Sequence, residues 1–319
     1  MESSVIKILN DKKGDLSPMS VKTYANAIHK VLELIGSTSL NDLFLKAKEI
    51  ITKLGEKYDK ANTVKTKIAS IIVLLRCMDT PKLKAKIDTA LAEYGKSIES
   101  LTGDIKKDLA DGEKNDKQKC NWITEEEGEK LKAELLSKVH EPVNTAKDLM
   151  HLRNYVLYCI YADMPSRNEL ADSKIIFSPS KKEQESLSDE YNYIILDKKK
   201  KTASYIMNSY KTAKSYGQKS ISLSADLYPL LLRYKSAVDK FNGGHSWAFM
   251  SNGGETKLTR NRLGVIYSEL GKSIGKKLGT SMNRHIAISR IVPIKSMQDL
   301  SYKMANSIDE QVNVYAKKD

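Results

Sequence analysis

A repeating helical pattern of apolar positions dominates the first hundred residues. Between Ser17 and Gly36, apolar side chains recur every three or four residues, and this spacing places them on one face of a helix. Ser17 followed by Pro18 is typical of a helix start, and Gly36 is typical of a helix end. The same spacing predicts further helices at 40–51, 64–75 and 83–98. This part of the chain is therefore expected to form a bundle of about four helices.

The second part of the chain combines helical patterns with short apolar segments. Thr124 and Glu127 have the spacing of a capping box, which predicts a helix start, and a long apolar helix is expected around 149–160. Ile221 and Leu223 alternate with serines, as in a half-buried strand. Strands are expected at 175–177, 193–196, 205–207 and 219–223. Later helices are expected after a cap at Ser224, at 263–274, around Arg284, and at 296–305 and 308–316.

Length and a change in composition predict two domains. The chain has 319 residues, whereas a single domain usually has about 100–200. A polar stretch that is poor in apolar residues predicts a linker at 106–121. We therefore expect a helical domain at 1–105 and a second domain at 122–319. The expected fold class is mainly α with a small β-sheet, of the α+β type.

Charge and composition narrow the classes of partner. Lys and Arg number 53 against 40 Asp and Glu, which gives a net charge of +13. Such an excess favours a polyanionic partner, although many basic proteins bind no nucleic acid. The three cysteines are too far apart to suggest a zinc site or a disulfide framework. The sequence shows no leader pattern and no apolar run of about 20 residues, so we expect an intracellular protein without a membrane partner.

Four short motifs contain the residues with candidate chemistry. Arg167 follows an apolar segment and precedes the first predicted strand, and Lys211 precedes the last one. Arg284 is followed directly by a histidine, and Tyr315 comes nine residues after Asn306. In their order and spacing, these motifs resemble the tyrosine recombinase (integrase) family.

The resemblance implies both an architecture and a reaction. In this family, a helical core-binding domain and a catalytic domain clamp double-stranded DNA, and four protomers act on two duplexes. By resemblance, Tyr315 is the nucleophile, Arg167 and Arg284 stabilise charge on the phosphate, and Lys211 is the general acid. The chemistry suits these residue types, because a guanidinium stays charged and the leaving 5′-oxygen needs a proton. The implied reaction is site-specific recombination or integration through a 3′-phosphotyrosyl intermediate, without a metal or nucleotide cofactor.

Two candidate site residues depart from the family pattern. Ser281 stands where a histidine or lysine is expected, and Asn306 stands where His or Trp is usual. A serine hydroxyl or an asparagine amide can still donate a hydrogen bond to a phosphate oxygen, but neither carries charge. His285, which follows the second arginine, is more simply explained as a packing residue.

Two assignments keep a rival. Lys214 or Lys219 could replace Lys211 as the general acid, because several lysines lie close together in this part of the sequence. Tyr302 is the nearest alternative to Tyr315 as the nucleophile, although the spacing from the second arginine favours Tyr315.

Three functions therefore remain open. The first is an active recombinase or integrase, such as a virus or mobile element encodes, acting on DNA in a prokaryotic cytoplasm, a host nucleus or a viral factory. The second is a DNA relaxer of the type IB topoisomerase kind, and the third is a catalytically weakened relative that only binds DNA. The helical first domain favours the recombinase. The lysines at 198–201 are most simply a solvated hairpin tip but could contact DNA phosphates, as could an edge formed by Lys257, Arg260 and Arg262.

Overall fold

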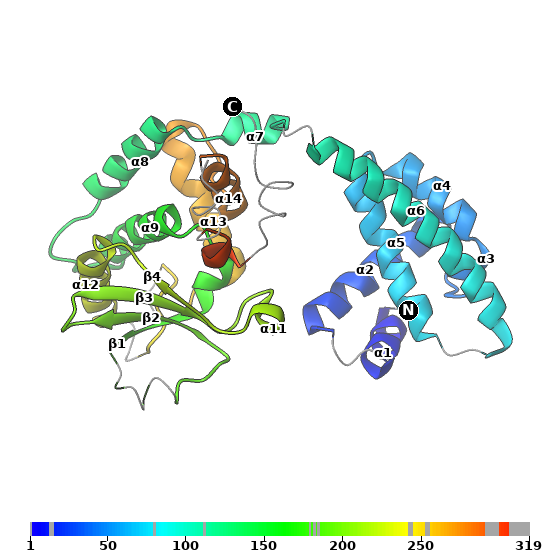
Figure 1. The fold of residues 1–319 in the computed structure, drawn as a ribbon, viewed down its shortest axis with the longest axis horizontal. Helices are drawn as coiled ribbons and strands as arrows, with labels where there is room; N and C mark the ends of the chain where they lie inside the picture. The colour runs from blue at the N-terminus through cyan, green and yellow to red at the C-terminus, as the bar shows by residue number, and fades with distance from the viewer. Residues whose placement is uncertain are drawn as a thin grey trace. The chain divides into compact units, whose positions relative to one another are not determined.

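The computed structural model describes residues 2–12, 16–78, 81–110, 113–178, 180, 183, 186–241, 245–252, 256–290 and 300–305. Internal contacts divide the chain into two units, Met1–Asp111 and Gly112–Asp319 (Figure 1). Much of the segment expected to be a linker is helical, since one helix continues to Ala110 and another, α7, covers Asp116–Asn121.

Unit 1 is entirely helical in its described part. Its first helix begins at Glu2 and had no counterpart in the sequence-based expectation, and the helix expected at 40–51 is two helices separated at Lys46. The elements are α1 (Glu2–Lys12), α2 (Pro18–Leu34), α3 (Asp42–Leu45), α4 (Ala47–Lys57), α5 (Ala61–Cys77), η1 (Pro81–Leu83) and α6 (Lys84–Ala110).

Local signals place the ends of α2 as predicted. The Ser17 side chain accepts a hydrogen bond from the backbone N–H of Ser20 at 3.1 Å, which satisfies one of the free donors at the helix start. Gly36 follows the helix with a φ of +65°, a conformation that glycine adopts without strain. Farther along, the buried Tyr94 of α6 donates its hydroxyl to the carbonyl of Leu43 at 2.7 Å and so ties α3 to α6.

Unit 2 combines one small sheet with several helices, so the mainly α class with a small β-sheet is confirmed. The strands follow the order β1-β2-β3-β4, with β1 and β2 parallel and the other pairs antiparallel. The elements after α7 are α8 (Glu125–Ser137), α9 (Ala146–Asp163), η2 (Asn168–Asp172), β1 (Ser173–Phe177), β2 (Asn192–Asp197), β3 (Thr202–Met207), α11 (Ala213–Tyr216), β4 (Lys219–Ser222), α12 (Leu227–Val238), α13 (Arg260–Leu270), η3 (Gly271–Ile274) and α14 (Thr280–Ser289).

Of the two helix starts expected in this unit, one is confirmed and one is wrong. Thr124 and Glu127 form the predicted capping box at the start of α8, with hydrogen bonds of 2.9 and 3.2 Å. Ser224 does not cap α12: the N-cap residue is Asp226, and the backbone N–H of Ser224 instead donates to the Asp163 carboxylate at 3.1 Å. Of the two last predicted helices, only 300–304 is described as helical, and 308–316 lies outside the described residues.

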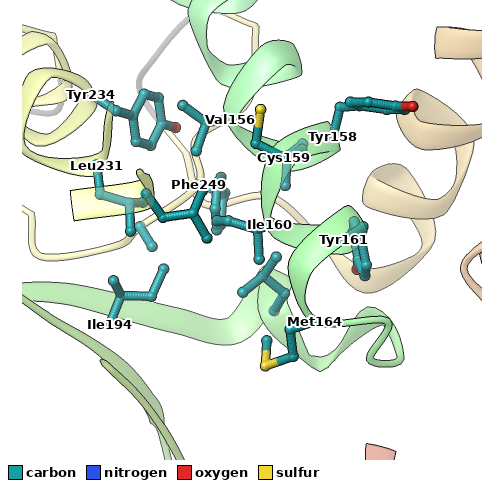
Figure 2. Close-up of a cluster of buried hydrophobic side chains, with 14 of the residues drawn as sticks. Val156, Tyr158, Cys159, Ile160, Tyr161, Met164, Ile194, Leu231, Tyr234 and Phe249 are labelled. Carbon is teal, nitrogen blue, oxygen red and sulfur yellow. The ribbon is translucent and has the colours of Figure 1, made fainter. Parts of the chain in front are cut away.

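Helix α9 forms the centre of the core of unit 2. Side chains from α9, α12 and β2 meet around Phe249 (Figure 2), and α9 and α12 cover one face of the sheet (Figure 1). Tyr234 of α12 stacks on Phe249 with ring centroids 5.7 Å apart. Met164, which directly follows α9, is also buried in this core. The core therefore fixes the backbone just before the motif around Arg167.

A glycine at the end of α13 has no room for a side chain. A Cβ at Gly271 would lie 2.6 Å from the carbonyl oxygen of Lys276 and 2.9 Å from Leu278. We predict that Gly271→Ala lowers the free energy of unfolding by about 1–3 kcal/mol, because backbone must move to relieve the clash. Gly95→Ala is the contrast, since its Cβ meets nothing within 4 Å in α6, and it should stabilise by about 0.5–1 kcal/mol. Thermal unfolding of both variants checks this, and equal stability of Gly271→Ala and wild type would contradict it.

Candidate active site

The two arginines singled out in the sequence lie in neighbouring positions in unit 2. The Arg284 side chain of α14 is only 7% exposed, and its Nη1 donates to the carbonyl of Ser166 at 3.1 Å and to that of Thr280 at 3.2 Å. Ser166 directly precedes Arg167, the N-cap residue of η2. A buried guanidinium therefore connects α14 to the turn that carries the other arginine.

Asn168, which the sequence analysis did not single out, strengthens this connection. Its Oδ1 accepts from the Thr280 hydroxyl at 2.9 Å, and its Nδ2 donates to the carbonyl of Arg260 at 3.3 Å. A Cβ at Gly264 would lie 3.0 Å from that amide nitrogen, so α13 packs closely against it. The amide thus fixes the starts of α13 and α14 beside the Arg167 turn.

A third part of the chain, residues 300–305, lies against the same place. Arg167 Nη1 donates to the carbonyl of Met304 at 3.4 Å, and the Thr212 hydroxyl donates to that of Ala305 at 3.1 Å. Lys219 Nζ donates to the carbonyl of Tyr302 at 3.0 Å. The last carbonyls of a helix carry partial negative charge, so cationic donors suit this position.

This helical turn is also fixed by packing and ends at Ala305. Leu300 and Met304 are buried against Ile288 of α14. Ala305 has a φ of +52°, in the left-handed region that commonly ends a helix but is costly for a residue with a Cβ. The described chain thus reaches this site one residue before Asn306. Asn306 and Tyr315 themselves lie outside the described residues.

The three candidate lysines have different surroundings. Lys211 lies on an exposed turn whose backbone N–H donates to the Glu169 carboxylate at 3.4 Å, and its ammonium has no hydrogen bond or ion pair among the described residues. Lys214 is exposed on α11. Lys219 of β4 is buried, and burial lowers its pKa. The Lys219 ammonium lies 4.4 Å from the centre of the Tyr302 ring, so its contacts hold residues 300–305 in place.

Glu169 supports the turn that carries Lys211. It is 4% exposed, and its second carboxylate oxygen, Oε2, is buried without a hydrogen-bond partner in the part of the chain that the structure describes. The backbone of the turn gives it only one long hydrogen bond. Because one of its oxygens lacks a donor, the Glu169 carboxylate can interact favourably with a cation that approaches the turn.

Two further candidates from the sequence, Ser281 and His285, lie on α14. Ser281 is exposed in the first turn of the helix, three residues before Arg284, and its hydroxyl makes no hydrogen bond within the described ranges. His285 is half-buried. Ser281 is therefore open to solvent on the side of α14 where a ligand could reach it.

The edge at Lys257, Arg260 and Arg262 and the hairpin tip at 198–201, both of which could contact phosphates, differ in their ion pairs. Lys257 and Arg260 both contact the Asp172 carboxylate, at 3.1 and 2.5 Å, so one acid partly neutralises two cations. Arg262 is exposed and makes no such pair within the described residues. The tip at 198–201 is exposed, and the Lys198 ammonium lies 3.8 Å from the centre of the Phe177 ring.

The described residues contain no group of three or more His, Cys, Asp or Glu side chains placed to hold a metal ion. None of the described helices is both long and apolar enough to cross a membrane.

Comparison with known proteins leaves the family open. No protein-family model matches the sequence, and no curated protein matches it. Among solved structures, the crystal structure of XerA recombinase is similar over 98% of this chain and 93% of that chain, with 13% sequence identity and a TM-score of 0.42. A similarity at this level does not assign the chain to a family.

The buried Lys219 gives a pH-dependent prediction. Because burial lowers its pKa, the folded chain binds fewer protons than the unfolded chain between this lowered pKa and the ordinary value of 10.5. The stability of the wild type should therefore rise relative to Lys219→Met as the pH increases through this window. Urea unfolding of both proteins at pH 8 and pH 10.5 measures the difference. A difference independent of pH would show that the Lys219 ammonium is not desolvated.

Proposed function

We propose that this protein is a site-specific DNA recombinase or integrase that cleaves and rejoins strands through a tyrosine. One observation carries the proposal: the turn at Arg167, the buried Arg284 and the turn at Lys211 converge with residues 300–305 in unit 2. These segments are far apart in the sequence, and they contribute the cationic groups that a phosphodiester transition state requires.

The proposed reaction assigns one role to each group. The Tyr315 oxygen attacks phosphorus and forms a 3′-phosphotyrosyl bond, while the bond to the 5′-oxygen breaks. Arg167 and Arg284 stabilise the charge on the non-bridging oxygens, and Ser281 and Asn306 donate further hydrogen bonds. The phosphotyrosyl bond conserves the energy of the phosphodiester, so rejoining by another 5′-hydroxyl needs no nucleotide cofactor.

We assign the general acid to Lys211. Its ammonium is exposed and unpaired among the described residues, and its backbone N–H donates one long hydrogen bond to Glu169, so the side chain can reach a DNA strand bound at the site. Lys219 is buried and its ammonium is engaged by Tyr302, which suits a residue that positions the 300–305 segment. This division gives the two lysines different expected phenotypes.

Unit 1 offers a surface suited to duplex DNA. A groove of about 480 Å³ between α2 and α5 has polar and basic side chains and no acidic residue in its lining. Amide and ammonium groups bind base edges and phosphates in a DNA groove. The lining residues are Thr23, Asn26, Ala27, Lys30, Asn62, Thr63, Thr66 and Lys67. We therefore propose that unit 1 binds the same duplex as unit 2. The resemblance to the recombinase family further implies that four protomers assemble on two duplexes for strand exchange.

A catalytically weakened DNA-binding protein is the second candidate. Two departures from the family pattern favour it. Ser281 is exposed and cannot carry the charge of the expected histidine or lysine, and position 306 is an asparagine. Such a protein would bind duplexes with the salt dependence of phosphate contacts but would form no covalent product.

The first functional test concerns the nucleophile. A library of duplexes of varied sequence, each with a nick that traps cleavage, avoids the need for a known target site. Tyr315→Phe should abolish covalent protein–DNA adducts and leave affinity nearly unchanged, because only the nucleophilic oxygen is lost. Tyr302→Phe is the matched control and should retain adduct formation. Adducts formed by Tyr315→Phe would overturn the assignment, and binding without adducts in the wild type would favour the second candidate.

The second test separates the two lysines. When sulfur replaces the leaving 5′-oxygen, the leaving group needs no proton, because a thiol has a pKa of about 8.5. The Lys211→Met variant should cleave ordinary DNA about 10²–10⁴-fold more slowly than the wild type. It should cleave the sulfur-containing DNA at close to the wild-type rate. Lys219→Met should be slow on both, since it disturbs the 300–305 segment. Rescue of Lys219→Met instead would exchange the two roles.

A further inference from the structure

Unit 2 contains a second basic site, away from the proposed catalytic residues. A pocket of about 220 Å³ opens between α8, α9, α13 and η3. Its basic lining side chains outnumber a single acidic one, Glu269. They are Lys138, His151, Arg153, Arg262 and Lys272.

The central feature of this pocket is a buried arginine with only neutral partners. Arg153 is 2% exposed. Its Nη1 donates to the carbonyl of Met250 and to Asn252 Oδ1, both at 3.0 Å, and its Nε and Nη2 donate to Asn154 Oδ1 at 3.2 and 3.0 Å. These bonds use four of the five guanidinium N–H groups, so one N–H on Nη2 remains without an acceptor among the described residues. Carbonyl and amide oxygens satisfy hydrogen bonds but do not cancel the charge.

The surrounding charges leave an excess of positive charge. Glu269 pairs with Lys272 at 3.3 Å, and Lys138 pairs with Glu134 at 2.6 Å. Arg262 has no hydrogen bond or ion pair from its side chain in the described ranges. Arg153 and Arg262 therefore face the pocket without a carboxylate from the described residues.

Two titratable groups that line the pocket have lowered pKa values, and burial is the largest cause for both. For Arg153, Tyr234 opposes the lowering of the pKa by burial, and the charge of Arg262 adds to it. Burial also lowers the pKa of His151, followed by the charges of Lys147, His140 and Lys138, which Asp148 opposes. The charges of Arg262, Lys147, His140 and Lys138 thus make a further positive charge in the pocket unfavourable.

We propose that this pocket binds a phosphate group through Arg153 and Arg262. Phosphate oxygens match the planar donors of guanidinium groups, and the pocket is large enough for a phosphoryl group but small for a drug-sized ligand. The ligand is either a backbone phosphate of bound DNA or a free phosphate. Both sources present the same oxyanion.

Thermal unfolding of the full chain in inorganic phosphate, compared with chloride at matched ionic strength, tests the binding. Saturating phosphate should raise the Tm of the wild type by about 3 °C or more. Phosphate also stabilises proteins nonspecifically, so Arg262→Gln supplies the baseline and should lose most of the rise. Arg233→Gln removes the same charge on α12, outside this pocket, and should respond as the wild type does. An equal response of Arg262→Gln and Arg233→Gln would overturn the proposal.

The two sources are separated by DNA binding. If the ligand is a backbone phosphate, Arg262→Gln should reduce the slope of log affinity against log salt by about one, whereas Arg233→Gln should not. An unchanged slope together with the loss of the phosphate response identifies free phosphate. Binding in either form should also raise the pKa of His151 in an NMR titration, and an unshifted His151 at saturating phosphate contradicts the site. Because the phosphate measurement contains no DNA, its failure is distinct from failure of the recombinase proposal.

Discussion

The burial of cationic side chains on neutral oxygen atoms is the constraint on which unit 2 depends. Arg284, Arg153 and Lys219 are each less than a tenth exposed, and each donates a hydrogen bond to a backbone carbonyl. A buried charge costs several kcal/mol when it lacks hydrogen-bond partners. The acceptor carbonyls must therefore lie within hydrogen-bond distance of these cations. They belong to Ser166, Met250 and Tyr302, so the buried cations fix the backbone at these three places.

The same constraint explains why the unit should attract an anion. A carbonyl satisfies a donor without cancelling its charge, so the positive charge of Arg153 persists inside the protein and is stabilised when a phosphate approaches. Asp172 shows the contrasting arrangement, because its carboxylate pairs directly with Lys257 and Arg260. Because Asp172 already pairs with them, Lys257 and Arg260 are less available to bind phosphate than the sequence alone suggested.

Local features of this fold could be predicted from sequence, and its long-range features could not. The ends of α2 and the start of α8 depend on side chains within three residues, so Ser17 and Thr124 were sufficient signals. Ser224 misled because a distant carboxylate, Asp163, engages its backbone. The periodicity of the sequence does not reveal that Asn168 joins α13 to α14. It also does not reveal that Lys219 is buried whereas Lys211 is exposed. Only the order of the motifs indicated that Arg167 and Arg284 belong to one site, since the two arginines are 117 positions apart in the sequence.

We propose that Arg167 and Arg284 stabilise a phosphodiester that is attacked by a tyrosine near the end of the chain. Proteolysis of the adduct formed with nicked duplex DNA, followed by mass spectrometry, identifies the attached residue and the DNA end that it carries. We predict a nucleotide joined through its 3′-phosphate to Tyr315. Attachment to another residue, or through a 5′-phosphate, would contradict it.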